Sequence, residues 1–349
     1  MRPHDGYYFE DYRLGQRFVH ATPRTITQGD VALYQALTGS RLPLHCSEPF
    51  AQALGYPAMP VDDLLVFHIA FGKTVPDISY NAVANLGYAE CRFLQPVFIG
   101  DTLRAESEVI GLKANSSGKT GVVYVRSTCL NQRGEVVLTW IRWVMVNKRI
   151  ADDKSREDHV PKFAPWVQRK DLLVPTFLRP AAIDTRATGG ERFWEDYRTG
   201  AAPATVIIAS AAGLTIDESD HTLATKLYQN TARVHFDQHH MKDSRFGQRL
   251  VYGGHIISIC RTLCYDGLEN ALGIVAINSG THHAPTFAGD TIYALSVVID
   301  TWELSRSLGA LRIRMSGFKN VAPTDKTAEA DPQSHVLSLD YTVLMPRRP

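Results

Sequence analysis

The chain of 349 residues repeats itself once, at an almost constant spacing. The segment ITQGDVALYQALTGSRLPLHCS returns as IDESDHTLATKLYQNTARVHFD, flanked in both copies by FEDYRLG or FWEDYRTG before it and PVFIGDTL or PTFAGDTI after it. Asp30 and Asp220 are 190 residues apart, and so are His45 and His235. The chain therefore duplicates one folding unit, and each position of one copy can be compared with its equivalent in the other.

The duplication divides the chain into two units. We place the first at residues 7–148, a charged, proline-interrupted linker at 149–191, and the second unit at 192–346. This length is sufficient for two domains with cores of their own.

Each unit has the same predicted order of helices and strands. A helix-start signal comes first, Thr27 in the first unit and Asp217 in the second, each with an aspartate three residues later. An almost continuously apolar stretch then predicts a buried helix. Long β-branched and aromatic runs, with a turn at residues 131–134, predict antiparallel strands. The pattern predicts an α+β fold in which sheet packs on helix.

Whole-chain properties exclude several classes of protein. A formal net charge of +1 argues against a dedicated nucleic-acid or membrane-surface binder. We find neither the roughly 20-residue apolar run of a membrane span nor a signal peptide. The five cysteines have no CxxC spacing, so we expect reduced, buried thiols in a cytoplasmic protein.

The segment LTGSRLPLHCSEPFAQALGYPAMPVDDLL resembles the signature of the hydratase-2 or MaoC-type dehydratase family. In that signature an Asp and a His five residues later flank an Asn-Pro pair, and a glycine-rich helix start follows. The segments NAVANLGYAE, FGKTVPD and YQNTARVHFDQH are similar to the mesaconyl-CoA hydratases of this family. The resemblance implies a double hotdog fold that reversibly hydrates a branched or dicarboxylic 2-enoyl-CoA, best guess mesaconyl-CoA to β-methylmalyl-CoA. It implies no cofactor, since CoA is part of the substrate.

The chain departs from the family pattern at the catalytic position. Where the family has Asp, this chain has Ser40 and Asn230, and only the histidines, His45 and His235, are kept in both units. An amide can orient a water molecule but cannot act as a base near neutral pH. Hydration of a conjugated thioester needs a base for the water and an acid for the α-carbon. One histidine could serve as both in turn, or a displaced carboxylate could assist it.

The two copies differ most at the start of the second helix. The second unit has Gly253 and Gly254 where the first has Asp63 and Leu64. A helix that begins with glycine can present backbone N–H groups to an enolate oxygen, although tight packing alone is the alternative reason for glycine. We therefore predict that the second unit is catalytic, with His235 as general base and acid, Asn230 positioning the water, and Gly253 or Gly254 donating to the oxyanion. The first unit would shape the acyl tunnel and the CoA site.

Further candidates lie around these residues. We predict that Arg233 holds a free substrate carboxylate, with a surface or structural arginine as the alternative. Asp62 or Asp63 could reach across from the first unit and replace the missing carboxylate. We also count His45, Asp237 and His255 as substrate-binding candidates. His282 and His283 either line the cleft or simply belong to a strand.

Other interpretations remain open. His235, His239 and His240 have the spacing of metal ligands on a helix, but zinc would need a third ligand, and we expect no metal. Two other functions compatible with the fold are an acyl-CoA thioesterase and a non-catalytic acyl-CoA-binding subunit. Association of hotdog units makes a homodimer plausible.

Overall fold

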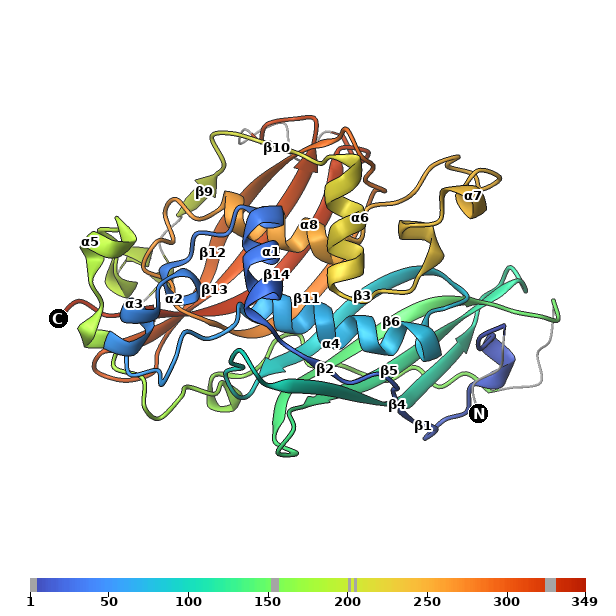
Figure 1. The fold of residues 1–349 in the computed structure, drawn as a ribbon, viewed down its shortest axis with the longest axis horizontal. Coiled ribbons are helices and arrows are strands. Elements are labelled where there is room, and N and C mark those ends of the chain that lie inside the picture. The colour runs from blue at the N-terminus through green and yellow to red at the C-terminus, as the bar shows by residue number, and fades with distance from the viewer. Residues whose placement is uncertain (1–4, 152–156, 200–201, 204–205, 324–330) are drawn as a thin grey trace.

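A computed structural model describes residues 5–151, 157–199, 202–203, 206–323 and 331–349. Its main feature is a 12-stranded sheet in the order β1-β4-β5-β6-β3-β11-β14-β13-β12-β10, with β2 beside β4 and β9 beside β12 (Figure 1). The strands of the two units join where β3 and β11 pair in antiparallel register, for example Tyr88 opposite Gly280. The units therefore form one continuous sheet.

The bounds of the elements follow the duplication. The strands of the first unit are β1 (Arg17–Val19), β2 (Arg24–Thr25), β3 (Ala82–Phe93), β4 (Thr102–Ala114), β5 (Thr120–Leu130) and β6 (Val136–Asn147). Those of the second are β9 (Ile207–Ala209), β10 (Leu214–Thr215), β11 (Ile274–His282), β12 (Thr291–Glu303), β13 (Leu308–Lys319) and β14 (His335–Pro346), and β7 (Arg198–Thr199) pairs separately with β8 (Ala202–Pro203). The α-helices are α1 (Gln28–Thr38), α2 (Pro43–Cys46), α3 (Glu48–Ala53), α4 (Asp63–Ile78), α5 (Thr185–Thr188), α6 (Glu218–Leu227), α7 (Gln238–Met241) and α8 (Gly253–Leu263). Short 3-10 helices are η1 (Phe9–Asp11), η2 (Arg169–Asp171), η3 (Pro180–Ala182), η4 (Trp194–Tyr197) and η5 (Arg233–His235).

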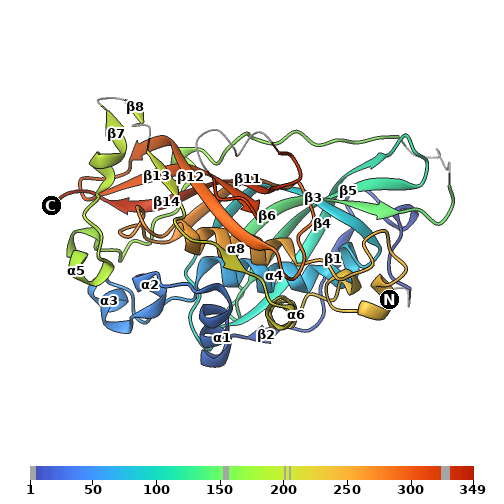
Figure 2. The same ribbon diagram turned by 90° about the horizontal axis from the view of Figure 1, so that it is seen from above.

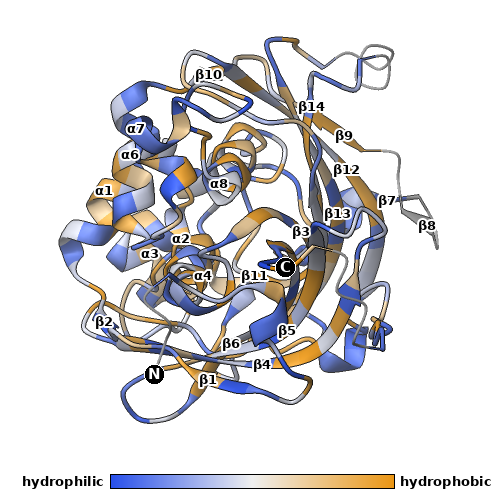
Figure 3. Cartoon of the chain, turned by 90° about the vertical axis from the view of Figure 1, so that its right-hand side faces the viewer, coloured by the Kyte–Doolittle hydropathy of each residue, from blue (hydrophilic) through white to orange (hydrophobic). Residues whose placement is uncertain are grey.

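The helices cover one face of the sheet, and the connecting segment between the units crosses the other face (Figure 2). On that second face the backbone N–H of Val167 donates to Asn278 Oδ1 of β11 at 2.9 Å. The sheet curves around α4 and α8, as Figure 3 shows. This is the predicted double hotdog arrangement, in which each unit wraps antiparallel strands around a central helix.

The two central helices meet at equivalent positions of the duplication. His68 of α4 and Ser258 of α8 are 190 residues apart, and His68 Nε2 lies 2.9 Å from Ser258 Oγ. Because equivalent residues contact each other only near a symmetry axis, this pair marks the approximate two-fold axis between the units. The C-terminal half of α4 consequently lies beside the N-terminus of α8.

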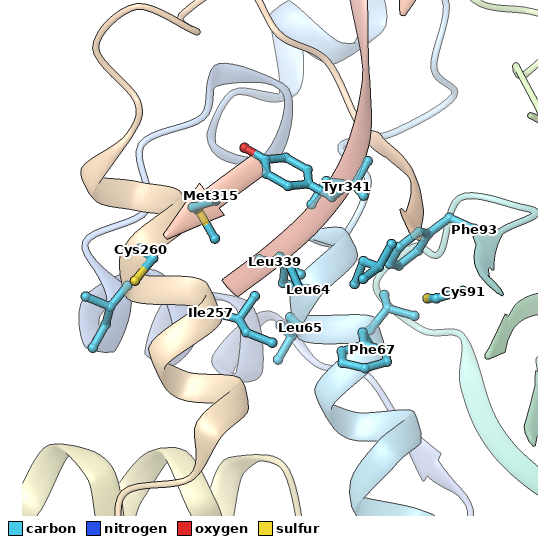
Figure 4. Packing of buried hydrophobic residues seen from close by; sticks show 14 of the residues in the cluster. Leu64, Leu65, Phe67, Cys91, Phe93, Ile257, Cys260, Met315, Leu339 and Tyr341 are labelled. Carbon is cyan, nitrogen blue, oxygen red and sulfur yellow. The ribbon is translucent and has the colours of Figure 1, made fainter. Parts of the chain in front are cut away.

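The core is built from both helices and the sheet. Leu64 and Phe67 of α4 and Ile257 of α8 belong to the same buried cluster as Met315 of β13 and Leu339 of β14 (Figure 4). A single cluster fixes the two helices to one another and to the sheet. The position of the α8 N-terminus relative to α4 is therefore set by apolar packing.

Several local predictions are confirmed, and two are corrected. Thr27 and Asp30 form a capping box at the start of α1, and the β5–β6 hairpin turns at residues 131–134. The almost continuously apolar stretch of the second unit, YGGHIISICRTLCYDGL (252–268), predicts a buried helix over its length, but α8 ends earlier, at Leu263, with Cys264 as its C-cap. All five cysteines are free, but Cys46 is exposed and not buried. Within the described ranges, no helix is long and apolar enough to cross a membrane.

Candidate active site

A cavity of about 260 Å³ lies between the two units. The first unit contributes the C-terminal half of α4, the start of β3, and Arg142 of β6. The second contributes the loop before α8, the first turn of α8, and the end of β11. The residues that line the cavity include Phe71, Ser79, Asn85, Tyr88, Arg142, Asn230, His235, Tyr252, Gly253 and His282. The structure thus brings Asn230, His235 and Gly253, predicted from the second unit, to one cavity.

His235 is held in a defined orientation at the wall of this cavity. Its Nδ1 lies 2.9 Å from the carbonyl oxygen of Leu250, so Nδ1–H donates to that oxygen. A neutral imidazole with hydrogen on Nδ1 carries its lone pair on Nε2. Burial lowers the pKa of His235 to about 4, which keeps the ring neutral at pH 7. The geometry provides a neutral histidine whose Nε2 can accept a proton.

His45 is held in the same way, but its surroundings differ. Its Nδ1 lies 3.1 Å from the carbonyl oxygen of Pro60, the equivalent of Leu250. Asp63 stands where the second unit has Gly253, and its Oδ2 is 3.9 Å from His45 Nε2. The same oxygen accepts the backbone N–H of Ile274 at 2.7 Å. In the first unit, therefore, a carboxylate faces the histidine where the second unit has only glycine.

The position of Asp63 corrects the prediction that it or Asp62 assists His235. The cavity is lined by residues of α4 from Phe71 onward, at least eight residues after Asp63. At about 1.5 Å per residue this separates them by roughly 12 Å along the helix. Asp62 caps α4, because its Oδ1 accepts the backbone N–H of Leu64 at 2.9 Å. Both aspartates belong to the first unit's own site.

The two glycines at the start of α8 have different surroundings. A Cβ atom on Gly253 would lie 2.5 Å from the ring of His282, and one on Gly254 would lie 2.6 Å from His68 Nδ1. Gly253 lines the cavity, whereas Gly254 packs on the core, which supports the packing alternative for that residue. The first N–H groups of a helix have no acceptor within the helix. In α8 the N–H of His255 already donates to the carbonyl oxygen of Tyr252 at 2.9 Å, which leaves those of Gly253 and Gly254 as the candidates at this wall.

Asn230 lines the cavity, as predicted, but its side-chain oxygen already accepts a hydrogen bond within the protein. It is buried, and its Oδ1 accepts the backbone N–H of Ala232 at 3.0 Å. That bond orients the side-chain amide and leaves Nδ2 as its donor. Asn230 can therefore donate a hydrogen bond into the cavity, but it cannot remove a proton.

Three further predicted binding residues lie elsewhere. Arg233 is exposed, and its guanidinium lies 5.4 Å from the centre of the Tyr80 ring. Asp237 caps α7 by accepting the backbone N–H of His240 at 2.9 Å. His255 is buried in α8, and burial lowers its pKa to about 4. None of the three predicted residues lines the cavity as the described residues define it, so the cavity gives their predicted roles no support.

Two further residues of the cavity are His282, whose sequence position left its role open, and Arg142, for which the sequence predicted no role. His282 ends β11 with its Nε2 3.2 Å from the hydroxyl oxygen of Tyr88, and burial, together with neighbouring His283 and His235, lowers its pKa to about 4. Arg142 is fully buried in β6. A signal for Arg142 was available, because a lone arginine interrupts the apolar strand sequence TWIRWVMV. Its role could not be inferred without knowing which face of the strand meets the cavity.

The structure offers no metal centre at the predicted histidines. His239 and His240 are exposed on α7. Across the part of the chain that the structure describes, no group of three or more His, Cys, Asp or Glu side chains is arranged to hold a metal ion.

Comparison with solved structures defines the class of the protein. A MaoC domain dehydratase from Chloroflexus aurantiacus superposes with a TM-score of 0.94 at 52% identity, covering 100% of both chains. A Mycobacterium tuberculosis protein described as having a double hotdog fold gives a TM-score of 0.74 at 25% identity, covering 97% of this chain and 98% of that one. The fold and the histidine site place this chain among the MaoC-like double hotdog proteins.

Sequence relatives narrow the class. The family model described as mesaconyl-CoA hydratase matches residues 2–324. A β-methylmalyl-CoA dehydratase from Chloroflexus aurantiacus is 53% identical over 350 residues, covering 98% of each chain. A mesaconyl-CoA hydratase from Cereibacter sphaeroides is 50% identical over 351 residues, covering 99% of this chain and 100% of that protein. The chain belongs to the mesaconyl-CoA hydratase family.

Proposed function

We propose that this protein is a hydro-lyase that reversibly adds water to a short, branched, dicarboxylic 2-enoyl-CoA, with mesaconyl-CoA and β-methylmalyl-CoA as the reacting pair. The observation that carries the proposal is the neutral His235, oriented by Leu250, in a cavity that also contains the start of α8. Two relatives at 50% identity or more are named for this pair of compounds. A cavity of about 260 Å³ lies near the lower end of the range for small-ligand sites, as a short acyl chain requires.

His235 is the group that activates water in this proposal. Its Nε2 takes a proton from a water molecule while the water oxygen bonds to the β-carbon of the enoyl group. The electron pair of the C=C bond moves toward the α-carbon and the thioester oxygen, giving an enolate. The enolate then takes a proton at the α-carbon, so the net change is the addition of one water molecule. Proton transfer of this kind contributes typically about 10²–10⁴-fold to rate.

The first turn of α8 and Asn230 assist the same step. We assign the N–H groups at the start of α8, with Gly253 at the cavity wall, to the enolate oxygen. Negative charge developing there favours protonation of His235, which offsets the low pKa of that histidine in the empty cavity. Asn230 Nδ2 would orient the water.

His282 is our proposed replacement for the carboxylate that the family has at the catalytic position. It lines the same cavity, lies against Gly253, and is close enough to His235 to influence its own pKa. We propose that the proton His235 takes from the water passes to His282, which delivers it to the α-carbon, so both imidazoles are neutral again at the end of the reaction. In this scheme a second histidine takes the place of the family's aspartate.

The remaining features of the proposal follow from the substrate. No cofactor is needed, because the thioester itself makes the α-proton acidic, and CoA enters as part of the substrate. A cytoplasmic location and a homodimer stay predictions, and light scattering of the purified protein would test the dimer.

Assays with a panel of enoyl-CoA thioesters test the function. We expect mesaconyl-CoA to lose its enoyl absorbance without release of free thiol. Thiol release would instead indicate a thioesterase, and binding without turnover of any thioester would indicate a non-catalytic acyl-CoA-binding subunit. Either of those two results would contradict the proposal.

A further inference from the structure

Arg142 is a fully buried cation at the wall of the cavity. Its Nη2 donates to Thr74 Oγ1 at 2.8 Å and to Ser79 Oγ at 3.2 Å, and its guanidinium lies 4.1 Å from the centre of the Phe71 ring. Among the residues that the structure describes, its Nε and Nη1 have no hydrogen-bond partner. Because Nε carries one hydrogen and Nη1 two, most of the donors of this guanidinium are unused. Thr74, Ser79 and Phe71 therefore hold the guanidinium of Arg142 in place, while its Nε and Nη1 hydrogens remain available to a ligand.

The charge of Arg142 is not balanced within the protein. No Asp or Glu of the described ranges lies within ion-pair distance of it. Burial lowers its pKa to about 10, so it remains protonated at neutral pH. On the same cavity wall, the side-chain oxygen and nitrogen of Asn85 also have no hydrogen-bond partner within the described ranges. A buried, unpaired cation is costly to keep, which points to an anion that is not part of the chain.

The second unit also contains a buried arginine near a histidine site. The duplication relates Phe71 to Arg261 of α8, and the strand register relates Arg142 to Tyr341, so the arginine has moved from strand to helix. Arg261 is also buried, and among the described residues its Nε, Nη1 and Nη2 have no hydrogen-bond partner; its charge is only a minor influence on the pKa of Asp63. The two arginines differ in position. Arg142 lines the cavity of the second unit's site around His235 (the open site), whereas Arg261 lies near the first unit's site around His45 and Asp63 (the closed site) and does not line the cavity.

We infer that Arg142 binds the free carboxylate of the acyl chain and thereby selects dicarboxylic over monocarboxylic enoyl-CoA substrates. The inference deepens the proposed function and rests on it. In mesaconyl-CoA attached as the 2-methylfumaryl thioester, the carboxylate is bonded to the carbon that receives the hydroxyl group. A guanidinium–carboxylate pair would fix that carbon relative to His235. It would also reduce the repulsion between the carboxylate and the attacking water as the water becomes negative.

Two substrates that differ in one group test the inference in the wild-type protein. Tiglyl-CoA has a methyl group where 2-methylfumaryl-CoA has the carboxylate, and the two thioesters are otherwise alike. We expect wild-type kcat/KM to favour 2-methylfumaryl-CoA by at least roughly 10²-fold, as expected for a buried charged contact. A preference below tenfold would overturn the inference without any variant. Turnover of neither thioester would contradict the proposed function itself.

Variants of Arg142 test whether this residue causes the preference for the dicarboxylic substrate. Arg142→Met should lower kcat/KM for 2-methylfumaryl-CoA by roughly 10²–10³-fold and leave that for tiglyl-CoA within a few-fold. Arg142→Lys keeps the charge and should lose less, which provides the test if the methionine variant does not fold. Arg261→Met is the matched control, because it removes an equally buried arginine from the closed site, and it should leave the substrate preference unchanged. Equal losses on both substrates in the Arg142 variants, or an altered preference in the control, would overturn the inference.

Discussion

The two histidine sites of the molecule share the same backbone hydrogen bond to the histidine and differ at one position, which is Asp63 in the first and Gly253 in the second. His45 and His235 each direct Nδ1 to the carbonyl of the residue fifteen positions later, at 3.1 Å and 2.9 Å. In the first site the carboxylate of Asp63 faces the histidine, whereas in the second Gly253 leaves the wall of the cavity open. The backbone arrangement that orients the histidine is therefore the same in both units, although the groups that face the histidine differ. The side chain at the first position of the helix, Asp63 or Gly253, is the difference between the histidine that faces a carboxylate and the histidine that lines a cavity.

Removing each histidine in turn is expected to give the largest difference between the copies. His235→Ala should lower kcat by about 10²–10⁴-fold, because the group that takes the proton from water is lost. His45→Ala should leave kcat within a few-fold, since His45 faces Asp63 and not the cavity. Initial rates of mesaconyl-CoA hydration by the two purified variants check this.

The histidine comparison needs a control for folding. His45 is 4% exposed and bonded to Pro60, so its removal should destabilise the protein by about 1–3 kcal/mol. Thermal unfolding of both variants separates this cost from catalysis. Equal loss of turnover in two folded variants would show that the copies are not functionally different.

Converting the open site into a copy of the closed one should have the next largest effect. Gly253→Asp places a carboxylate against the ring of His282 and next to the position assigned to the enolate oxygen. We expect a loss of about 10²–10³-fold in kcat, comparable to the loss of one oxyanion donor. The reverse change, Asp63→Gly, is the control and should leave turnover unchanged. Full activity of a folded Gly253→Asp variant would remove the α8 N-terminus from the mechanism.

The pH dependence of the reaction tests the protonation state of the open site. Burial lowers the pKa values of His235 and His282 to about 4, so both are neutral well below the usual histidine value of about 6.5. We expect kcat/KM to be flat between pH 6 and 8 and to fall only as pH approaches about 4. An acidic limb centred near 6.5 would contradict this assignment.

Stability must be followed in the same pH series. A histidine whose pKa is lower in the folded state contributes stability above its unfolded pKa, and this contribution is lost as pH falls from about 6.5 toward 4. Circular dichroism at each pH distinguishes unfolding from titration of the active site. Only the range in which the protein stays folded should be used for the rate profile.

The fold followed from the sequence, and comparison of the copies also pointed to the unit whose histidine lines a cavity; that this unit is the catalytic one stays a prediction. The change from Asp63 to Gly253 correctly indicated which site is open, since it depends on one residue at a helix start. Contacts across the units could not be predicted in the same way. Asp63 meets the backbone of Ile274, and Arg142 meets α4, through a packing of two helices against one sheet that no local pattern specifies.

The predicted site residues that do not line the cavity share a physical cause. Asp62 and Asp237 stand next to the candidate histidines or helix starts in sequence, but their carboxylates cap helices. Capping and substrate binding both favour an aspartate near a helix N-terminus, so composition alone cannot separate them. The prediction for Arg233 rests on its closeness to His235 in sequence, whereas Arg142 reaches the cavity only through the fold.

The smallest expected effect concerns Asp63, and it tests whether the closed site is only structural. Burial raises the pKa of Asp63 to about 6, so the folded protein binds this proton more tightly than the unfolded chain does, whose value is 3.8. The folded state therefore loses stability as pH rises from about 4 to about 6. Asp63→Asn removes this titration while keeping an acceptor for Ile274. Relative to wild type, the variant should gain about 1–3 kcal/mol between pH 4 and pH 7, measured by denaturant unfolding at both pH values, with turnover unchanged. A change in turnover or in the pH–rate profile would instead mean that Asp63 acts on the open site after all, from the far end of α4.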